Sequence, residues 1–174
     1  RQELKKNLPA ICFSGTFKKR ADDSILEHSG FICLDFDGYN TKKDMISEKE
    51  RLSKDRYVYS VFVSPSGNGL KALVKIPKEP DNHKLFFLSL EKYFKSDYFD
   101  KTSKNISRVC YESYDPLLHL NANSQTWKKI EEQEFKPVDK YTARPTIPVT
   151  DENKIVDILM KWWNKKYGLK SGER

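Results

Sequence analysis

The sequence lacks a long apolar run and contains only three cysteines. No stretch approaches the roughly 18 apolar residues of a membrane-spanning helix, so we expect no membrane partner. Cys12, Cys33 and Cys110 each lie in a separate apolar run. An odd number of cysteines at wide spacing argues against a disulfide framework and a zinc knuckle. Buried, reduced thiols are typical of cytosolic proteins, and we therefore expect a cytoplasmic location.

The composition that remains is that of a basic, globular domain. Hydrophobic residues make up 37% of the 174 residues, and aromatic residues make up 13%, which is enough for a core. Charged residues reach 33%, with 32 Lys and Arg against 25 Asp and Glu, for a net charge of +7. A positive excess favours polyanionic partners, of which nucleic acid is the commonest. A basic surface without a specific partner is the alternative.

Hydrophobic periodicity predicts an α+β fold, a sheet with helices packed on one face. We expect strands over 9–17, 31–37, 57–63, 70–76 and 108–113, with a last short strand or turn within 119–127. Helices are expected over 42–55, with an apolar stripe of Met45, Ile46 and Leu52, and over 80–96. A polar loop containing RADDS (20–24) separates the first two strands. Residues 1–130 are expected to form the main domain, 131–150 a linker, and 151–174 a helix that begins a following helical domain.

The strand over 31–37 ends in two aspartates that share one face. Because side chains alternate along a strand, Ile32, Leu34 and Phe36 are predicted to face the core. Asp35 and Asp37 then project from the opposite, open face, with Cα atoms about 6–7 Å apart. Such a carboxylate pair can hold one or two Mg²⁺ or Mn²⁺ ions for phosphoryl or nucleotidyl transfer. A solvated acidic edge is the alternative.

The same letters, LDFDG, allow a second enzyme hypothesis. They resemble the first motif of haloacid-dehalogenase-like phosphatases, in which the first aspartate is a nucleophile and the second is a general acid. That family has Thr or Val after the glycine, whereas this chain has Tyr39. It also needs a later acidic motif on a parallel sheet, and the sequence offers no convincing one.

A glycine-containing turn, SPSGNGLK over 64–71, follows the next predicted strand. Gly67 and Gly69 would let backbone N–H groups approach an anion, and Ser64 or Ser66 could add hydroxyl donors. Lys71 could add a point charge to a phosphate. The stretch is not a Walker A loop, because GxxxxGK[ST] is absent and a strand follows. An ordinary hairpin turn is the alternative.

Asp100 and Arg108 complete the set of candidate site residues. Asp100 precedes a predicted strand and could supply a third metal carboxylate. Arg108, eight residues later, could contact a phosphate or a template strand. A surface aspartate and a salt-bridged arginine are the structural alternatives.

Taken in order, these motifs resemble the archaeo-eukaryotic primase superfamily. The chain offers hhhDhD, then SxSGxGLK, then YFD, then SRxxxxSxDP, over about residues 10–125. The resemblance is to primase-polymerase domains of bacterial mobile elements, including the VirE-like N-terminal group. It implies that Asp35, Asp37 and Asp100 are the catalytic metal ligands. One departure is Lys71, which stands where many members carry a phosphate-contacting histidine.

The resemblance implies an RRM-like catalytic core with its site in a cleft between two small α/β units. It implies a DNA primase or primase-polymerase that uses Mg²⁺ or Mn²⁺, nucleoside triphosphates and a single-stranded DNA template. The nucleotide would contact the residues of the glycine turn and two cations: Ser64, Ser66, Gly67, Gly69, Lys71 and Arg108. We expect a helicase region further along a longer parent chain. The alternative is an inactive primase-like module that binds nucleotide or single-stranded DNA.

Overall fold

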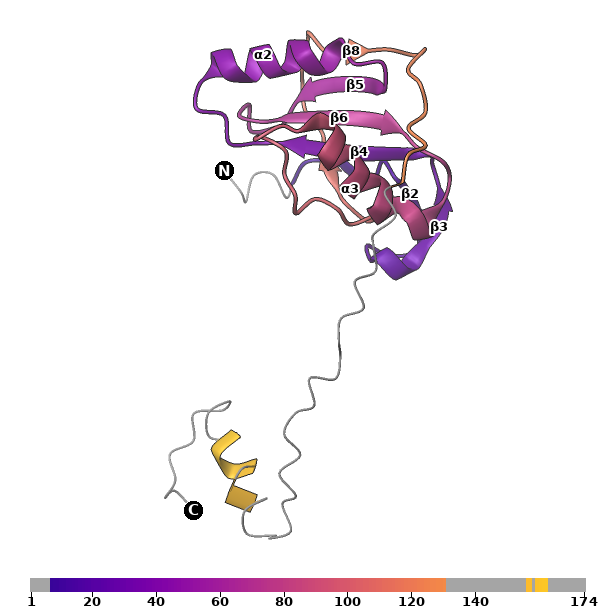
Figure 1. Cartoon of the computed structure of the whole chain (residues 1–174), viewed down its shortest axis with the longest axis vertical. Helices are drawn as coiled ribbons and strands as arrows, with labels where there is room; N and C mark the ends of the chain where they lie inside the picture. Colours follow the sequence, from indigo (N-terminus) through magenta and orange to yellow (C-terminus); the bar gives the residue numbers. More distant parts are fainter. Residues whose placement is uncertain (1–6, 131–155, 158, 163–174) are drawn as a thin grey trace. The chain divides into compact units, whose positions relative to one another are not determined.

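A computed structural model describes residues 7–130, 156–157 and 159–162 (Figure 1). The chain divides into two units, residues 1–132 and 133–174. Of the expected linker and C-terminal helix, residues 131–155, 158 and 163–174 lie outside the described residues. The described residues 156–157 and 159–162 are helical. The site belongs to the first unit.

The centre of the first unit is a four-stranded antiparallel sheet with the strand order β4-β6-β5-β8 (Figure 1). Its strands are β4 (Phe31–Phe36), β5 (Val58–Val63), β6 (Leu70–Lys75) and β8 (His119–Leu120). Helix α2 joins β4 to β5, and helix α3 follows β6, which gives a β-α-β-β-α-β order. An RRM sheet places its last strand beside the first, whereas β8 lies beside β5.

Both helices pack on one face of this sheet. Helix α2 (Lys42–Ser53) begins with a capping box between Thr41 and Asp44. Helix α3 (His83–Phe94) follows the short 3₁₀ turn η2 (Pro80–Asn82), and Lys95, with φ 46°, is its C-cap residue. Their apolar residues form one core with the sheet. It includes Ile32, Leu34, Phe36, Met45, Leu52, Val58, Val61, Leu70, Ala72, Val74, Phe86, Phe87, Leu90 and Phe94.

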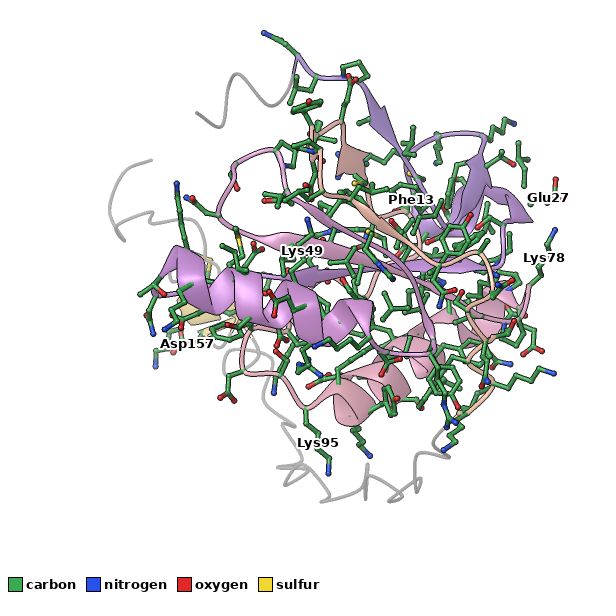
Figure 2. All side chains as sticks on the ribbon, turned by 90° about the horizontal axis from the view of Figure 1, so that it is seen from above. Phe13, Glu27, Lys49, Lys78, Lys95 and Asp157 are labelled. Atoms are coloured by element: carbon green, nitrogen blue, oxygen red, sulfur yellow. The ribbon has the colours of Figure 1, made fainter. Side chains whose placement is uncertain are left out.

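Short strands cover part of the other sheet face. They are β1 (Ala10–Ile11) paired with β7 (Cys110–Tyr111), and β2 (Gly15–Phe17) paired with β3 (Ile25–His28) across the 3₁₀ turn η1 (Asp22–Ser24). Figure 2 shows α2 and α3 on one side of the sheet and the N-terminal strands on the other. A smaller core of Cys33, Phe62, Leu73 and Cys110 fills the space between the strands and the sheet.

The α+β class, the central strands and both helices are confirmed, and three details are wrong. The expected strand 9–17 is two short strands in different sheets, because the chain turns between Cys12 and Gly15. Strand β3 was missed, since RADDS is followed by only four strand residues. Ile46 is 54% exposed and does not belong to the apolar stripe of α2. Within the described residues, no helix has the length and apolar content needed to cross a membrane.

Candidate functional site

Asp35 lies on the sheet face opposite the helices, as the alternation of β4 predicts. The expectation that this face is open is wrong for Asp35, which is only 3% exposed. Cys33 of β4 and Cys110 of the short strand β7 belong to the smaller core on this face. The sequence of β4 does not show this burial, because β7 comes from a distant part of the chain.

Two cations bind the buried Asp35 carboxylate. Lys71 stands directly opposite Asp35 in the β4–β6 ladder, and its Nζ contacts Oδ1. Arg108 Nη2 and Nε contact Oδ2 at 2.7 and 3.2 Å. Burial alone would lower the pKa of Lys71 and of Arg108, but the attraction of Asp35 outweighs it and both pKa values are raised. Both cations therefore stay charged beside Asp35.

Asp100 comes next to Asp35, although 64 residues of sequence separate them. Phe99 forms an antiparallel bridge with Phe36, and the Asp100 N–H donates to the Asp35 carbonyl at 2.8 Å. Arg108 Nη2 lies 3.4 Å from Asp100 Oδ2. The other carboxylate oxygen, Oδ1, accepts hydrogen bonds from the N–H and hydroxyl of Thr102. One guanidinium therefore joins the two carboxylates.

Asp37 follows the end of β4 and is exposed. Its N–H donates to the Tyr98 carbonyl at 2.8 Å, which fixes the backbone beside the Asp100 segment. Gly69, at the end of the hairpin turn, approaches the Asp37 side chain so closely that a Cβ there would overlap Oδ1. A side chain at position 69 would therefore displace the Asp37 carboxylate from its present place.

The hairpin turn is formed as predicted, and its residues divide between two hollows. Ser64 and Ser66, whose hydroxyl oxygens are 3.0 Å apart, line a pocket with Asp35 and Asp37. Gly67 has φ +73° and donates its N–H to the Ser64 carbonyl at 2.8 Å. It lines a different hollow, of about 320 Å³, beside the start of α2. In this arrangement the Gly67 N–H therefore already has a backbone acceptor, and its predicted role as an anion donor stays a prediction.

The site pocket has a volume of about 290 Å³ and gathers residues from five separate segments. Its charged lining consists of three cations and two carboxylates, namely Arg20, Lys71, Arg108, Asp35 and Asp37. Sequence reasoning missed Arg20, which lies in the polar RADDS segment. No local pattern identifies it, because only the packing of the β2–β3 unit on the sheet brings it to the pocket. The arrangement suits an anion in contact with cations and hydroxyl groups.

A larger cavity of about 820 Å³ adjoins this pocket, and Tyr111 lines both. Most of its lining is apolar or aromatic, with Phe13, Tyr59, Phe62 and Leu73 among its residues. Asp115, one of its two acidic residues, is paired with Lys49 at 2.7 Å. The charged pocket therefore carries the groups capable of acid–base or phosphate chemistry.

The described residues do not form a divalent-metal site as they stand. Carboxylate oxygens are suitable ligands for Mg²⁺ or Mn²⁺. However, each oxygen of Asp35 already contacts a cation, and the described part of the chain contains no cluster of three or more acidic, His or Cys side chains that could hold a metal. A metal at Asp35 therefore requires Lys71 and Arg108 to leave its carboxylate.

Comparison with known proteins identifies a family. No curated protein and no solved structure matches the chain. The sequence matches the family described as "BT4734-like, N-terminal domain" over residues 3–119, about two thirds of the chain and all of the site. Arg20, Asp35, Asp37, Lys71, Asp100 and Arg108 all fall within the match. The chain therefore belongs to the BT4734-like N-terminal domain family.

Proposed function

We propose that this domain is a nucleotidyltransferase of the primase-polymerase type, which joins nucleotides on a single-stranded DNA template. The observation that carries the proposal is the meeting of Asp35, Asp37, Lys71 and Arg108 in one pocket, with Asp100 beside it. These residues come from distant segments, in the order that the primase resemblance implies. A network of carboxylates and cations supported by a rigid sheet is suited to positioning a triphosphate.

Binding of a nucleotide to this pocket requires an exchange of ion pairs. Lys71 and Arg108 are bound to Asp35, so a phosphate group must compete with that carboxylate for them. When bound, a divalent metal would stabilise negative charge on the phosphates. It would also balance the charge of the Asp35 carboxylate once Lys71 and Arg108 contact the phosphate instead. Asp37 is the exposed carboxylate of the pair and Asp100 is the third candidate ligand. An RRM-like core that keeps the β-α-β-β-α-β order but has its last strand beside β5 belongs to the same proposal. A cytoplasmic location and a helicase region in a longer chain belong to it as well.

The second candidate function is a primase-like module that binds nucleotide or single-stranded DNA without synthesis. The specific observation in its favour is the pairing of Asp35 with two cations, which occupies both oxygens of a proposed metal ligand. Lys71, in place of a histidine, can hold phosphate but lacks the proton-transfer chemistry of an imidazole. We do not propose the phosphatase alternative, because every strand pair in the described residues is antiparallel.

Nucleotide binding is required by the polymerase and is one of the two activities proposed for the binding module. We expect a nucleoside triphosphate with Mn²⁺ or Mg²⁺ to raise the melting temperature of the wild-type protein. Asp37→Asn should reduce the shift in the presence of metal, and Asp97→Asn, an exposed aspartate that is not among the pocket residues, serves as the matched control. A wild-type protein whose melting temperature is unchanged by any nucleotide would contradict the polymerase and would leave the second candidate only with the binding of single-stranded DNA.

A further inference from the structure

Arg20 differs from the other two cations of the pocket in its surroundings. Lys71 and Arg108 are both bound to Asp35. Arg20 is exposed, lines the same pocket, and makes no ion pair or hydrogen bond with any residue between 7 and 130 in the structure. Its guanidinium keeps its donors available for a ligand, in a fork that matches the oxygens of a phosphate.

The charge of the pocket depends on this residue. Its lining contains Arg20, Lys71 and Arg108 against Asp35 and Asp37, which is three positive charges against two negative charges. Without Arg20 the lining would be formally neutral and would attract an anion only weakly. With Arg20 the lining has one net positive charge, which offsets the Asp100 carboxylate beside the pocket, and the hydroxyl groups of Ser64 and Ser66 belong to the same lining.

The segment that carries Arg20 is held in place. Asp22 Oδ1 accepts a hydrogen bond from the Ser107 N–H at 3.0 Å, which ties η1 to the residue before Arg108. Within the segment, the Lys18 N–H donates to the Ser24 carbonyl at 2.9 Å and the Ala21 N–H to the Lys19 carbonyl at 2.8 Å. Binding therefore orders one side chain rather than a whole loop, which keeps the entropic cost small.

We propose that Arg20 is a phosphate-binding residue of this pocket, which recognises the extended polyphosphate chain of a ligand in preference to a single phosphate. A chain of phosphates presents more charge than Lys71 and Arg108, both shared with Asp35, can compensate. The inference rests on the proposed function for its ligand class, but it holds for a polymerase and for a binding module alike.

The test uses sodium tripolyphosphate and inorganic phosphate as probes, without metal, and measures binding by calorimetry on the full chain. The variants are Arg20→Ala, Arg20→Lys and the control Lys19→Ala. The control removes one positive charge at the neighbouring position, and the Lys19 side chain does not line the pocket. We expect Arg20→Ala to weaken tripolyphosphate binding about tenfold, with a smaller effect on phosphate. Arg20→Lys should be intermediate, since it keeps the charge but loses the fork. Lys19→Ala should change binding less than about twofold.

Equal losses in Arg20→Ala and Lys19→Ala would overturn the inference, because they would indicate a general charge effect. A wild-type protein that does not bind tripolyphosphate would overturn it as well. Nucleotide incorporation on a single-stranded template separates this inference from the proposed function. Arg20-dependent tripolyphosphate binding without incorporation supports the inference and contradicts the polymerase. Nucleotide incorporation by the wild-type protein, together with an unchanged KM for the nucleotide in Arg20→Ala, supports the polymerase and overturns the inference.

Discussion

At the scale of single residues, the central feature is a buried carboxylate with two cationic partners. Asp35 is 3% exposed, and both its oxygens contact Lys71 or Arg108. Removing one member of a buried ion pair leaves its partners without compensation, which costs more than the pair itself contributes. Asp35 therefore supports the fold as well as the site, and a change at this position has to be measured for both effects.

We predict that Asp35→Asn lowers the free energy of unfolding by about 3 kcal/mol, because Lys71 and Arg108 lose the charge that compensates them. Urea unfolding at pH 7 measures the change. Asp97→Asn, on an exposed residue, is the control and should stay within about 0.5 kcal/mol of wild type. An equally small effect of Asp35→Asn would show that the ion pairs do not form in solution.

A substitution by alanine is expected to have different effects at the two glycines of the hairpin turn, Gly67 and Gly69. A Cβ at Gly69 would overlap Asp37 Oδ1, whereas a Cβ at Gly67 would meet nothing within 4 Å. Gly69→Ala should therefore displace the Asp37 carboxylate and reduce nucleotide binding in the presence of metal. Gly67→Ala should leave the site intact and cost about 1 kcal/mol of stability, because its φ of +73° disfavours a side chain. Melting curves with and without nucleotide separate the two effects, and identical behaviour of both variants would contradict this account of the turn.

The extent to which sequence predicted the site also differs from residue to residue. Period-two alternation correctly placed Asp35 and Asp37 on one side, because that rule depends only on the strand itself. It did not predict that Asp35 is buried, since Arg108 and the β7 residue Cys110, which lie on this face, come from a distant part of the chain. Arg20 was missed for the same reason. Lys71 was expected to contact phosphate, and the ladder register shows that Asp35 is its partner in the structure.

At the scale of elements, a buried histidine pair joins the end of β3 to the start of α3. The Gly30 N–H donates to His28 Nδ1 at 3.0 Å, so His28 carries its proton on Nε2, which lies 3.2 Å from His83 Nδ1. Protonation of His83 would place two N–H groups against each other. Burial and the nearby His28 ring lower the pKa of His83 to about 4, although Asp22 acts in the opposite direction.

Stability should therefore fall as the pH drops. The unfolded chain takes up the proton near the ordinary histidine pKa of 6.5, whereas folded His83 resists it until about pH 4. We predict that the free energy of unfolding of the wild-type protein falls by about 2 kcal/mol more than that of His83→Gln when the pH is lowered from 7.5 to 5. Urea unfolding of both proteins at the two pH values provides the comparison. If the difference in unfolding free energy between the two proteins is the same at both pH values, His83 does not cause the pH dependence.

Element boundaries could be predicted closely where a long segment has one clear character. The helix over 42–55 was expected and α2 spans Lys42–Ser53, with a capping box between Thr41 and Asp44 at its start that the sequence analysis did not use. The hairpin of β5 and β6 was recognised from its turn residues. The strands β1, β7 and β8 lie within segments that were expected to contain strands, but each has only two residues and therefore no period that could fix its bounds. Their pairing partners could not be predicted, because those partners lie far away in the chain.

At the scale of the whole molecule, the chain is basic, and the lining of its charged pocket has one net positive charge. The excess of seven positive charges favours association with a nucleic-acid backbone, and such association weakens as salt is added. The pocket, at about 290 Å³, has the volume for the charged part of a nucleotide rather than for the whole of it. The base and the template strand would then lie outside this pocket.

Nucleotide incorporation on a single-stranded DNA template, in Mg²⁺ or Mn²⁺, tests the central claim most directly. We predict that the wild-type protein extends or starts strands and that Asp37→Asn loses at least about 100-fold in rate, as expected when a group that stabilises transferred phosphate is removed. Asp37 is exposed, so the variant should fold, and Asp97→Asn should retain full activity. No product from wild type with either metal, together with retained nucleotide binding, would contradict the polymerase and leave the binding module as the function of this domain.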